Sequence, residues 1–300
     1  MFIFSWLLPA WAADTIDITE VETKELFKLA NRHTQMGNYQ QAVQEFTVII
    51  DREITKTSVK TSVKTNAYLN RCFAQLQLEN HLESLADCSQ VIKLNPQTKE
   101  AYLHRGLTNY RLGRYSQALI DYDQLISLNP QDFRAYYNRG LAKVGMEDYL
   151  GAIEDYNQAL NNIPPEETKK IAMVYNDRGL AYFHQANIDQ AQADFNHAIA
   201  LDRRAARTYY NLACICHHQG DLQKAIHNFT LALEVQPEQP DAYLSRAMIY
   251  QKLGDSALAI ADLYTAAKHF RSQGQVSDYQ ATMEIIRSIE YQQLETGAIG

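Results

Sequence analysis

The chain has 300 residues, of which 46% are hydrophobic and 21% charged, a composition typical of a folded globular protein rather than a disordered one. Its formal net charge is −7, because 35 Asp and Glu outnumber 28 Lys and Arg. This acidic balance argues against nucleic acid as a partner, since nucleic-acid binding requires a basic face.

The first thirteen residues, MFIFSWLLPAWAA, are apolar and carry no charged side chain. The run is shorter than the roughly 20 apolar residues that cross a bilayer, so we expect no integral membrane span. Ala10–Ala12 reads AWA, a small-x-small cleavage pattern typical of a secretory signal peptide, although the positive charge that should open such a peptide is missing. We interpret residues 1–13 as a signal peptide, which predicts export to a periplasm or thylakoid lumen; otherwise the protein would be cytoplasmic.

Beyond this segment the chain repeats itself. The stretch AYLHRGLTNYRLGRYSQALIDYDQLI, which begins at Ala101, is followed by AYYNRGLAKVGMEDYLGAIEDYNQAL from Ala135. The start of one stretch lies 34 residues after the start of the other, and a period of this length accommodates two amphipathic helices and their turns. The expected helix pairs cover residues 23–56, 65–98, 99–132, 133–166, 172–205, 206–239 and 240–273.

Four positions of the repeat carry the same kind of residue in most units. The eighth and twentieth residues are small, which lets the two helices of a pair approach closely. The twenty-fourth is mostly large and fills the space beside that contact, and a proline at the thirty-second ends the second helix in four units. The small residues are Ala30, Cys72, Gly106, Gly140, Gly179, Ala213 and Ala247 at the eighth position, and Ala42, Ser84, Ala118, Ala152, Ala191, Ala225 and Ala259 at the twentieth.

The period and these positions together resemble the tetratricopeptide repeat (TPR) family over about nine-tenths of the chain. The resemblance implies an all-α fold: a right-handed α-solenoid superhelix of about seven TPR helix pairs in a single domain, residues 14–300. Residues 276–295 predict one further amphipathic helix that caps the apolar face of the last pair. The repeats are also similar to those of cyanobacterial and plastid TPR proteins, whose members assist the assembly of membrane complexes.

Two stretches depart from the strict period: residues 55–64, TKTSVKTSVK, and residues 164–170, PPEETKK. We interpret both as surface loops or lengthened helix ends. The alternative is that their lysines contact an acidic partner.

The seventh position of the repeat, usually Leu in this family, is Arg in five units, and those units have Asp at the twenty-third. Where the seventh residue is Leu29 or Leu212, the twenty-third is Glu45 or Asn228. Because a half-buried Arg needs a carboxylate beside it, we predict an ion pair between the two helices of each unit, rather than an arginine ladder for phosphate. The predicted pairs are Arg71–Asp87, Arg105–Asp121, Arg139–Asp155, Arg178–Asp194 and Arg246–Asp262.

By resemblance, the first helix of each pair lines the concave face of the superhelix. The residues expected there are apolar and aromatic with scattered polar groups, which is typical of a protein-binding surface; the alternative is that the superhelix buries part of them as core. The predicted partner-binding groove consists of Phe27, Asn31, Leu69, Phe73, Leu103, Leu107, Tyr110, Arg111, Tyr137, Leu141, Asn176, Leu180, Phe183, His184, Tyr210 and Met248. The predicted function is a non-enzymatic scaffold that binds a partner peptide or helix and assists assembly of a multiprotein complex, with self-association through the last helix as a further mode.

No enzyme signature is present: the chain has no Gly-rich phosphate loop, no G-x-S-x-G and no H-E-x-x-H. We therefore expect no catalytic residue and no cofactor. The rival function is a metal-binding or redox protein centred on Cys214, His217 and His218, which one helical turn would gather on a single face. We favour an ordinary groove position for Cys214 and predict no metal site.

Cys72 and Cys88 occupy the eighth and twenty-fourth positions of one unit, which face each other across its helix pair. In an oxidising compartment they would form a disulfide. In a reducing compartment they would be two small core residues, and the sequence leaves both alternatives open.

Overall fold

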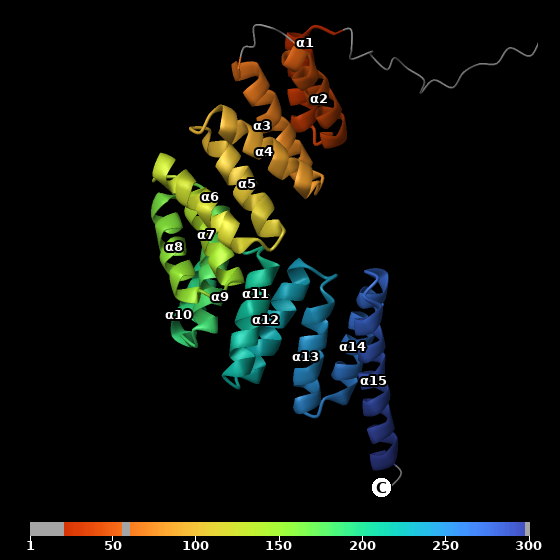
Figure 1. Ribbon diagram of the computed structural model, residues 1–300. Helices are drawn as coiled ribbons and strands as arrows, with labels where there is room; N and C mark the ends of the chain where they lie inside the picture. Colours follow the sequence, from red (N-terminus) through yellow and green to blue (C-terminus); the bar gives the residue numbers. More distant parts are fainter. Residues whose placement is uncertain (1–20, 56–60, 298–300) are drawn as a thin grey trace, which may run out of the picture. The chain divides into compact units, whose positions relative to one another are not determined.

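The computed structural model describes residues 21–55 and 61–297. Within these ranges all regular secondary structure is α-helical, in fifteen helices that pack as consecutive pairs (Figure 1), so the predicted all-α fold of helix pairs is confirmed. The chain divides into two compact units, residues 1–146 and 147–300. The segment interpreted as a signal peptide lies outside the described ranges, and the assignment of residues 14–300 to one domain stays a prediction.

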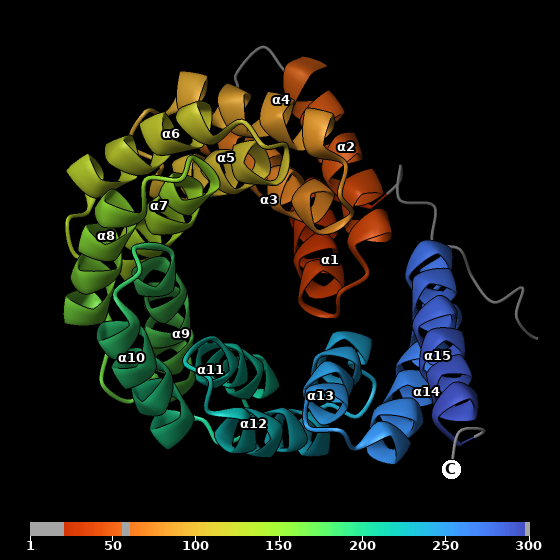
Figure 2. The ribbon, with the colours of Figure 1, turned by 90° about the horizontal axis from the view of Figure 1, so that it is seen from below.

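The first helices of successive pairs lie side by side in the first unit. Each helix packs on its chain neighbours, and α1 also contacts α3, α3 contacts α5, and α5 contacts α7, whereas α2, α4 and α6 make no comparable contacts with one another in the described part of the chain (Figure 2). The odd-numbered helices therefore form a common inner wall. The helices are α1 (Thr23–Gln35), α2 (Tyr39–Thr55), α3 (Thr61–Gln77), α4 (His81–Leu94), α5 (Lys99–Arg111), α6 (Tyr115–Leu128) and α7 (Phe133–Gly145).

The second unit continues the same local arrangement, and α9 contacts α11 as well as its chain neighbours. Its last helix packs on α14, and buried Ile286 and Ile289 join Ala247 and Leu263 in one apolar cluster, as expected of a capping helix. No described helix of the chain combines the length and apolar character needed to cross a bilayer. The helices are α8 (Tyr149–Asn162), α9 (Thr168–His184), α10 (Ile188–Leu201), α11 (Ala206–His218), α12 (Leu222–Val235), α13 (Pro240–Lys252), α14 (Ser256–Ser272) and α15 (Val276–Gly297).

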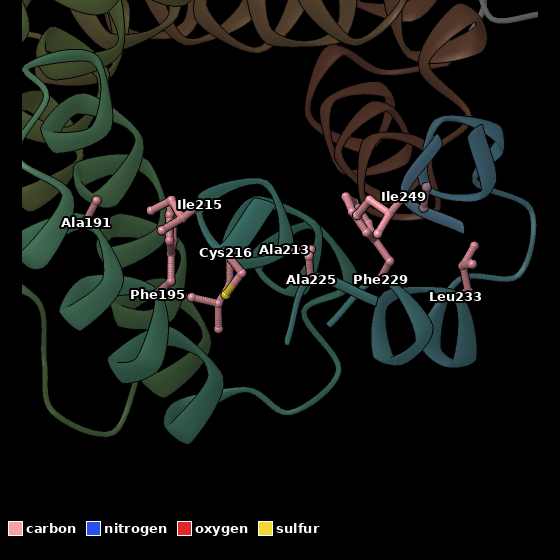
Figure 3. Packing of buried hydrophobic residues seen from close by; sticks show 11 residues of the cluster. Ala191, Phe195, Ala213, Ile215, Cys216, Ala225, Phe229, Leu233 and Ile249 are labelled. Atoms are coloured by element: carbon pink, nitrogen blue, oxygen red, sulfur yellow. The ribbon is translucent and has the colours of Figure 1, made fainter. Parts of the chain in front are cut away.

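The helices of a pair interlock through one small and one large residue. A Cβ atom on Gly106 would lie 2.6 Å from Cε1 of Tyr122, and one on Gly179 would lie 2.8 Å from Cε1 of Phe195. Both rings are fully buried, so they have little room to retreat. Figure 3 shows the equivalent packing in the second unit, where Phe195 lies in a cluster of small and aliphatic side chains from α10 to α13. The recurring small residues therefore set how closely the two helices approach.

The turn between the two helices of a pair requires left-handed backbone at one residue. Gly113 supplies it with φ of 70°, and the amide of the next residue, Arg114, donates to the carbonyl of Asn109 at 2.8 Å. Glycine adopts this conformation without a steric penalty. In the turn before α10 the same place is taken by Ala186, with φ of 55°, so that turn carries a strain of about 1 kcal/mol that the glycine turns avoid.

Candidate partner-binding surface

The predicted ion pairs are formed inside their own helix pairs. Arg71 on α3 donates from Nε and Nη2 to the two carboxylate oxygens of Asp87 on α4, at 2.7 and 2.8 Å. This two-bond geometry is the strongest that Arg and a carboxylate form. The other pairs within one unit are Arg105–Asp121, Arg178–Asp194 and Arg246–Asp262, with shortest N–O distances of 2.6, 2.7 and 2.7 Å. These four predictions are confirmed. Arg139 belongs to the compact unit 1–146 and Asp155 to the compact unit 147–300, and their pairing stays a prediction.

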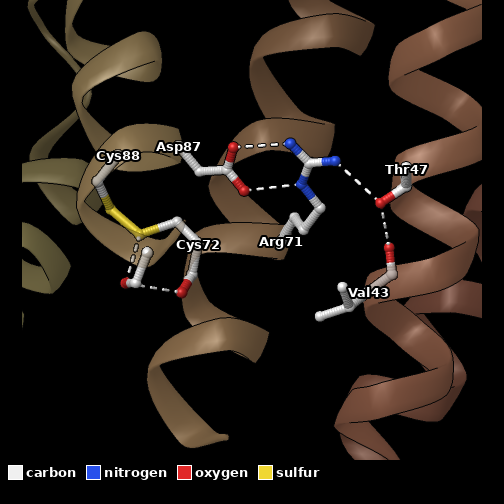
Figure 4. A network of polar contacts seen from close by, with 7 residues as sticks. Val43, Thr47, Arg71, Cys72, Asp87 and Cys88 are labelled. Carbon is white, nitrogen blue, oxygen red and sulfur yellow. Dashed lines mark hydrogen bonds and ion pairs between the residues drawn. A yellow bond between two sulfur atoms is a disulfide. The ribbon is translucent and has the colours of Figure 1, made fainter. Parts of the chain in front are cut away.

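Each arginine also contacts the second helix of the preceding pair, a contact that the repeat pattern does not predict. Arg71 Nη1 donates to Thr47 Oγ1 of α2 at 2.9 Å, so the guanidinium lies between Asp87 and Thr47 (Figure 4). The corresponding contacts are Arg105 to Ser89, Arg139 to Asp123, Arg178 to Asn157 and Arg246 to Thr230. One side chain thus connects a pair internally and to its predecessor.

In the two repeats that have Leu instead of Arg at the seventh position, the polar side chain at the twenty-third position has a different hydrogen-bond partner. In the repeat that carries Leu29, Glu45 is fully buried, and His33 Nδ1 lies 2.9 Å from its carboxylate. Beside Leu212, Asn228 donates instead to the carbonyl of Lys224 at 3.0 Å. Buried polar groups in this position are therefore paired in both cases.

The arginine row is a structural network and not an anion-binding surface. Burial alone would lower the pKa of the Arg71 guanidinium, but the hydrogen bonds and charge of Asp87 outweigh it and raise that pKa. Burial raises the pKa of Asp87, and Arg71 offsets only part of this effect. Because the N–H donors of Arg71 are directed at Asp87 and Thr47, the guanidinium has no free pair of donors with which to bind a phosphate.

The predicted groove residues differ in accessibility. Leu103 and Asn176 are buried, whereas Arg111, His184 and Met248 are exposed. The other predicted groove residues are half-buried: Phe27, Asn31, Leu69, Phe73, Leu107, Tyr110, Tyr137, Leu141, Leu180, Phe183 and Tyr210. Most of the proposed surface is therefore partly open, and its contact with a partner stays a prediction.

Phe73, Leu107 and Leu141 occupy the ninth position of three successive repeats, on α3, α5 and α7. All three are half-buried, and the helices that carry them are neighbours in the inner wall. Phe73 also contacts the rings of Tyr39 and His104, with centroids 6.1 and 5.2 Å away. The wall thus offers a row of three half-buried apolar side chains, of which Phe73 packs between aromatic neighbours.

Some polar groove residues join one first helix to the next. Asn70 Nδ2 on α3 donates to Asn31 Oδ1 on α1 at 3.0 Å, and Asn211 on α11 donates to Asn176 on α9 at 2.9 Å. Arg111 Nη1 donates to a backbone carbonyl of α3 at 3.0 Å. Asn70 and Asn211 were not among the predicted groove residues. The signal that points to them is a recurring asparagine directly before the Arg or Leu of the seventh position.

The four cysteines fall into two groups. Cys72 on α3 and Cys88 on α4 form a disulfide, with Cα atoms 5.5 Å apart and both side chains fully buried. Cys214 and Cys216 are free thiols, half-buried and buried respectively, and burial raises the pKa of each. His104 on α5 lies near the disulfide, and burial lowers its pKa to about 4.

The rival site at Cys214, His217 and His218 is not assembled. Among the described residues, the one group of three potential ligands whose donor atoms lie within 4.8 Å of one another lies in the first unit. His217 and His218 are exposed at the end of α11, while Cys214 is half-buried next to Tyr210. Helical spacing predicts these residues on a single face, but the His218 ring packs edge-on against Phe183, with centroids 5.9 Å apart, and the three donor atoms do not converge.

Comparison with protein families gives four matches over the central and C-terminal parts of the chain. Models of the tetratricopeptide repeat match residues 133–165, 170–238 and 219–275, and a TPR repeat model matches residues 109–147. A search of curated proteins gives no match.

Solved structures show the same fold at low sequence identity. A tetratricopeptide repeat protein from Parabacteroides merdae superposes with a TM-score of 0.67 at 18% identity, covering 87% of this chain and 98% of that one. The pilF protein of Pseudomonas aeruginosa has a TM-score of 0.62 at 14% identity, with coverage of 75% and 98%. A chain of the APC/C hetero-tetramer Cut9-Hcn1 has a TM-score of 0.58 at 16% identity, with coverage of 89% and 57%.

Proposed function

The chain is a tetratricopeptide repeat protein, and we propose that it is a non-enzymatic scaffold whose first helices bind an extended or helical segment of a partner protein. The observation that carries this proposal is the row of half-buried apolar side chains at the same repeat position of adjacent helices, Phe73, Leu107 and Leu141. Apolar side chains left partly open in a row on a folded surface are typical of protein-binding sites.

The chemistry of this row favours a segment with apolar side chains spaced along its length. Burial of one large apolar side chain contributes about 1.5–3 kcal/mol, so three such contacts can outweigh the cost of ordering a short peptide. The row is already held by the packing of its helices, so little further ordering falls on this protein. Selectivity would come from neighbouring polar groups such as Asn70 and Arg111.

The proposal is tested by selecting peptides that bind the protein and by comparing their affinities for two variants, one substituted on the inner wall and one substituted on second helices. The full chain is immobilised and used to select binders from a library of random linear peptides, and affinities of selected peptides are measured by fluorescence anisotropy. Replacing Tyr137 and Leu141 on α7 with Ser should weaken binding by roughly tenfold or more. The matched control is Leu82→Ser with Ile120→Ser, two apolar residues on second helices that are 66% and 67% exposed.

The control variant should bind the selected peptides with unchanged affinity, because its substitutions lie outside the inner wall. Circular dichroism of each variant verifies that the helices are intact. The proposal would be overturned if the Tyr137 and Leu141 variant bound the peptides as tightly as the wild type does. It would also be overturned if the control variant lost as much affinity as the α7 variant, because the peptides would then bind elsewhere.

We further propose that the protein is exported and acts in the assembly of a multiprotein complex. The apolar N-terminal segment and the Cys72–Cys88 disulfide support export, since structural disulfides persist in oxidising compartments. N-terminal sequencing of the protein isolated from its native cells should give a start near Ala13. A chain that retains residues 1–13 and is recovered with cytoplasmic proteins would contradict export.

A further inference from the structure

Three side chains from three helices meet at the disulfide of the first unit. The sulfur atoms of Cys72 on α3 and Cys88 on α4 and a ring nitrogen of His104 on α5 all lie within 4.8 Å of one another. Cys, Cys and His are the ligands that zinc takes in proteins, bound at about 2.3 Å for sulfur and 2.0–2.1 Å for nitrogen. Two thiolates on a tetrahedral zinc ion lie about 3.8 Å apart, so the two sulfurs, which are bonded to each other in this structure, would separate to this distance after reduction.

The histidine is available for a ligand. His104 Nδ1 is buried and has no hydrogen-bond partner, which is unusual because buried polar side-chain atoms are normally paired. The Phe73 ring, with its centroid 5.2 Å from that of His104, holds the imidazole in place. The unpaired Nδ1 and the closeness of a His104 ring nitrogen to the two sulfurs together point to this place as a ligand site.

We propose that the reduced form of this protein binds one zinc ion through Cys72, Cys88 and His104, so that disulfide and metal are alternative occupants of the same site. The proposal is separate from the peptide-binding function, because both cysteines are fully buried and neither is among the predicted groove residues. Soft thiolate and imidazole ligands favour zinc over the hard cations magnesium and calcium. Ser84 Oγ is a further polar atom close to these ligands, 3.4 Å from Cys72 Sγ.

Replacement of the disulfide by zinc requires a two-electron reductant, and a dithiol can supply the electrons. The dithiol gives two electrons and two protons to the Cys72–Cys88 bond, which breaks to two thiols while the reductant closes to its own disulfide. Zinc then displaces the two thiol protons to solvent, and the two thiolates and a neutral imidazole form a site with no net charge. A neutral complex of this kind is compatible with a buried position, where an uncompensated charge would be costly.

The two occupants connect different helices. The disulfide joins only α3 and α4, the two helices of one pair, whereas a zinc ion would add α5 of the following pair through His104. A hydroxyl chain already runs across the same contact: Ser84 Oγ lies 3.1 Å from Thr108 Oγ1, which donates to the carbonyl of His104 at 2.8 Å. Metal binding would therefore strengthen the contact between successive repeats.

Cobalt titration of the full chain tests the proposal. The protein carries Cys214→Ser and Cys216→Ser, so that Cys72 and Cys88 are its only thiols, and it is reduced with dithiothreitol and desalted without oxygen. Added Co²⁺ should give thiolate-to-cobalt charge-transfer and tetrahedral ligand-field bands that saturate at about one ion per chain and disappear when Zn²⁺ displaces it. The oxidised protein should give no such bands.

His104 is tested separately from the thiols. His104→Ala and the bulkier His104→Gln should each weaken Co²⁺ binding by roughly tenfold or more, whereas His81→Ala, at another half-buried histidine of the same unit, should leave it unchanged. Circular dichroism verifies that each variant is folded. Absence of the bands in the reduced protein, or full affinity in both His104 variants, would overturn the proposal.

Discussion

Removing one arginine from the network should destabilise its unit strongly. Arg178 donates to both carboxylate oxygens of Asp194 at 2.7 Å, and the Asp194 side chain is only 3% exposed. Arg178→Leu would leave this carboxylate buried without its partner, at a cost of about 3–5 kcal/mol in the free energy of unfolding. The Nη1 contact to Asn157 is also lost, but Asn157 is half-buried, so water can replace that donor.

The following repeat indicates how the loss can be repaired. It carries Leu212 and Asn228 at the positions of Arg178 and Asp194, and Asn228 donates to the carbonyl four residues earlier in its helix. Arg178→Leu combined with Asp194→Asn should reproduce this arrangement, because the amide introduced by the second substitution would reach the carbonyl of Gln190. The double variant should therefore lose only about 1 kcal/mol, a coupling of at least about 2 kcal/mol between the two sites.

Urea denaturation of the wild type, both single variants and the double variant, followed by circular dichroism, measures the cycle. Because repeat arrays can unfold in parts, hydrogen exchange of α9 and α10 amides reports the same change locally. Asp189→Asn, at an exposed residue of α10, is the control and should change stability by no more than about 0.5 kcal/mol. A single variant within about 1 kcal/mol of wild type, or additive losses in the double variant, would refute the reasoning.

Three further predictions concern the turns, the cysteines and one histidine. Ala186→Gly should raise the free energy of unfolding by about 0.5–1 kcal/mol, since φ at this residue is 55° and glycine relieves the left-handed strain at some entropic cost; urea denaturation measures it, and a loss of stability would contradict it. Thiol titration in denaturant should find two thiols per chain before reduction and four after it, in line with one disulfide and two free cysteines; four thiols in the untreated protein would show that the disulfide is absent. The pKa of His104 is lowered from 6.5 to about 4, chiefly by burial, with Glu100 raising it and Arg134 lowering it further. The unfolded chain therefore takes up a proton that the folded state resists, so stability should fall by roughly 3 kcal/mol as the pH drops from 6.5 to about 4. His104→Gln should remove that part of the pH dependence, and an unchanged profile in urea denaturation would contradict the assignment.

The contacts made inside one repeat could be predicted from the sequence. The small and large residues of a pair recur at fixed positions, so Gly106 and Tyr122 were expected to meet, and they do. The same regularity paired Arg71 with Asp87, because Arg and Asp appear and disappear together between units. Both inferences depend only on the number of residues that separates two positions within one helix pair. This number is the same in each repeat and can be counted in the sequence.

The contacts between repeats were decided by the tertiary structure. The sequence does not give the angle at which one pair packs on the next, and that angle places Thr47 beside Arg71 and Asn70 beside Asn31. It also brings His104 close to the disulfide of the preceding pair. Helical periodicity had instead indicated Cys214, His217 and His218 of α11 as the candidate group of metal ligands. Donor atoms converge only when helix packing directs long side chains to a common point, and a one-dimensional period carries no information about that direction.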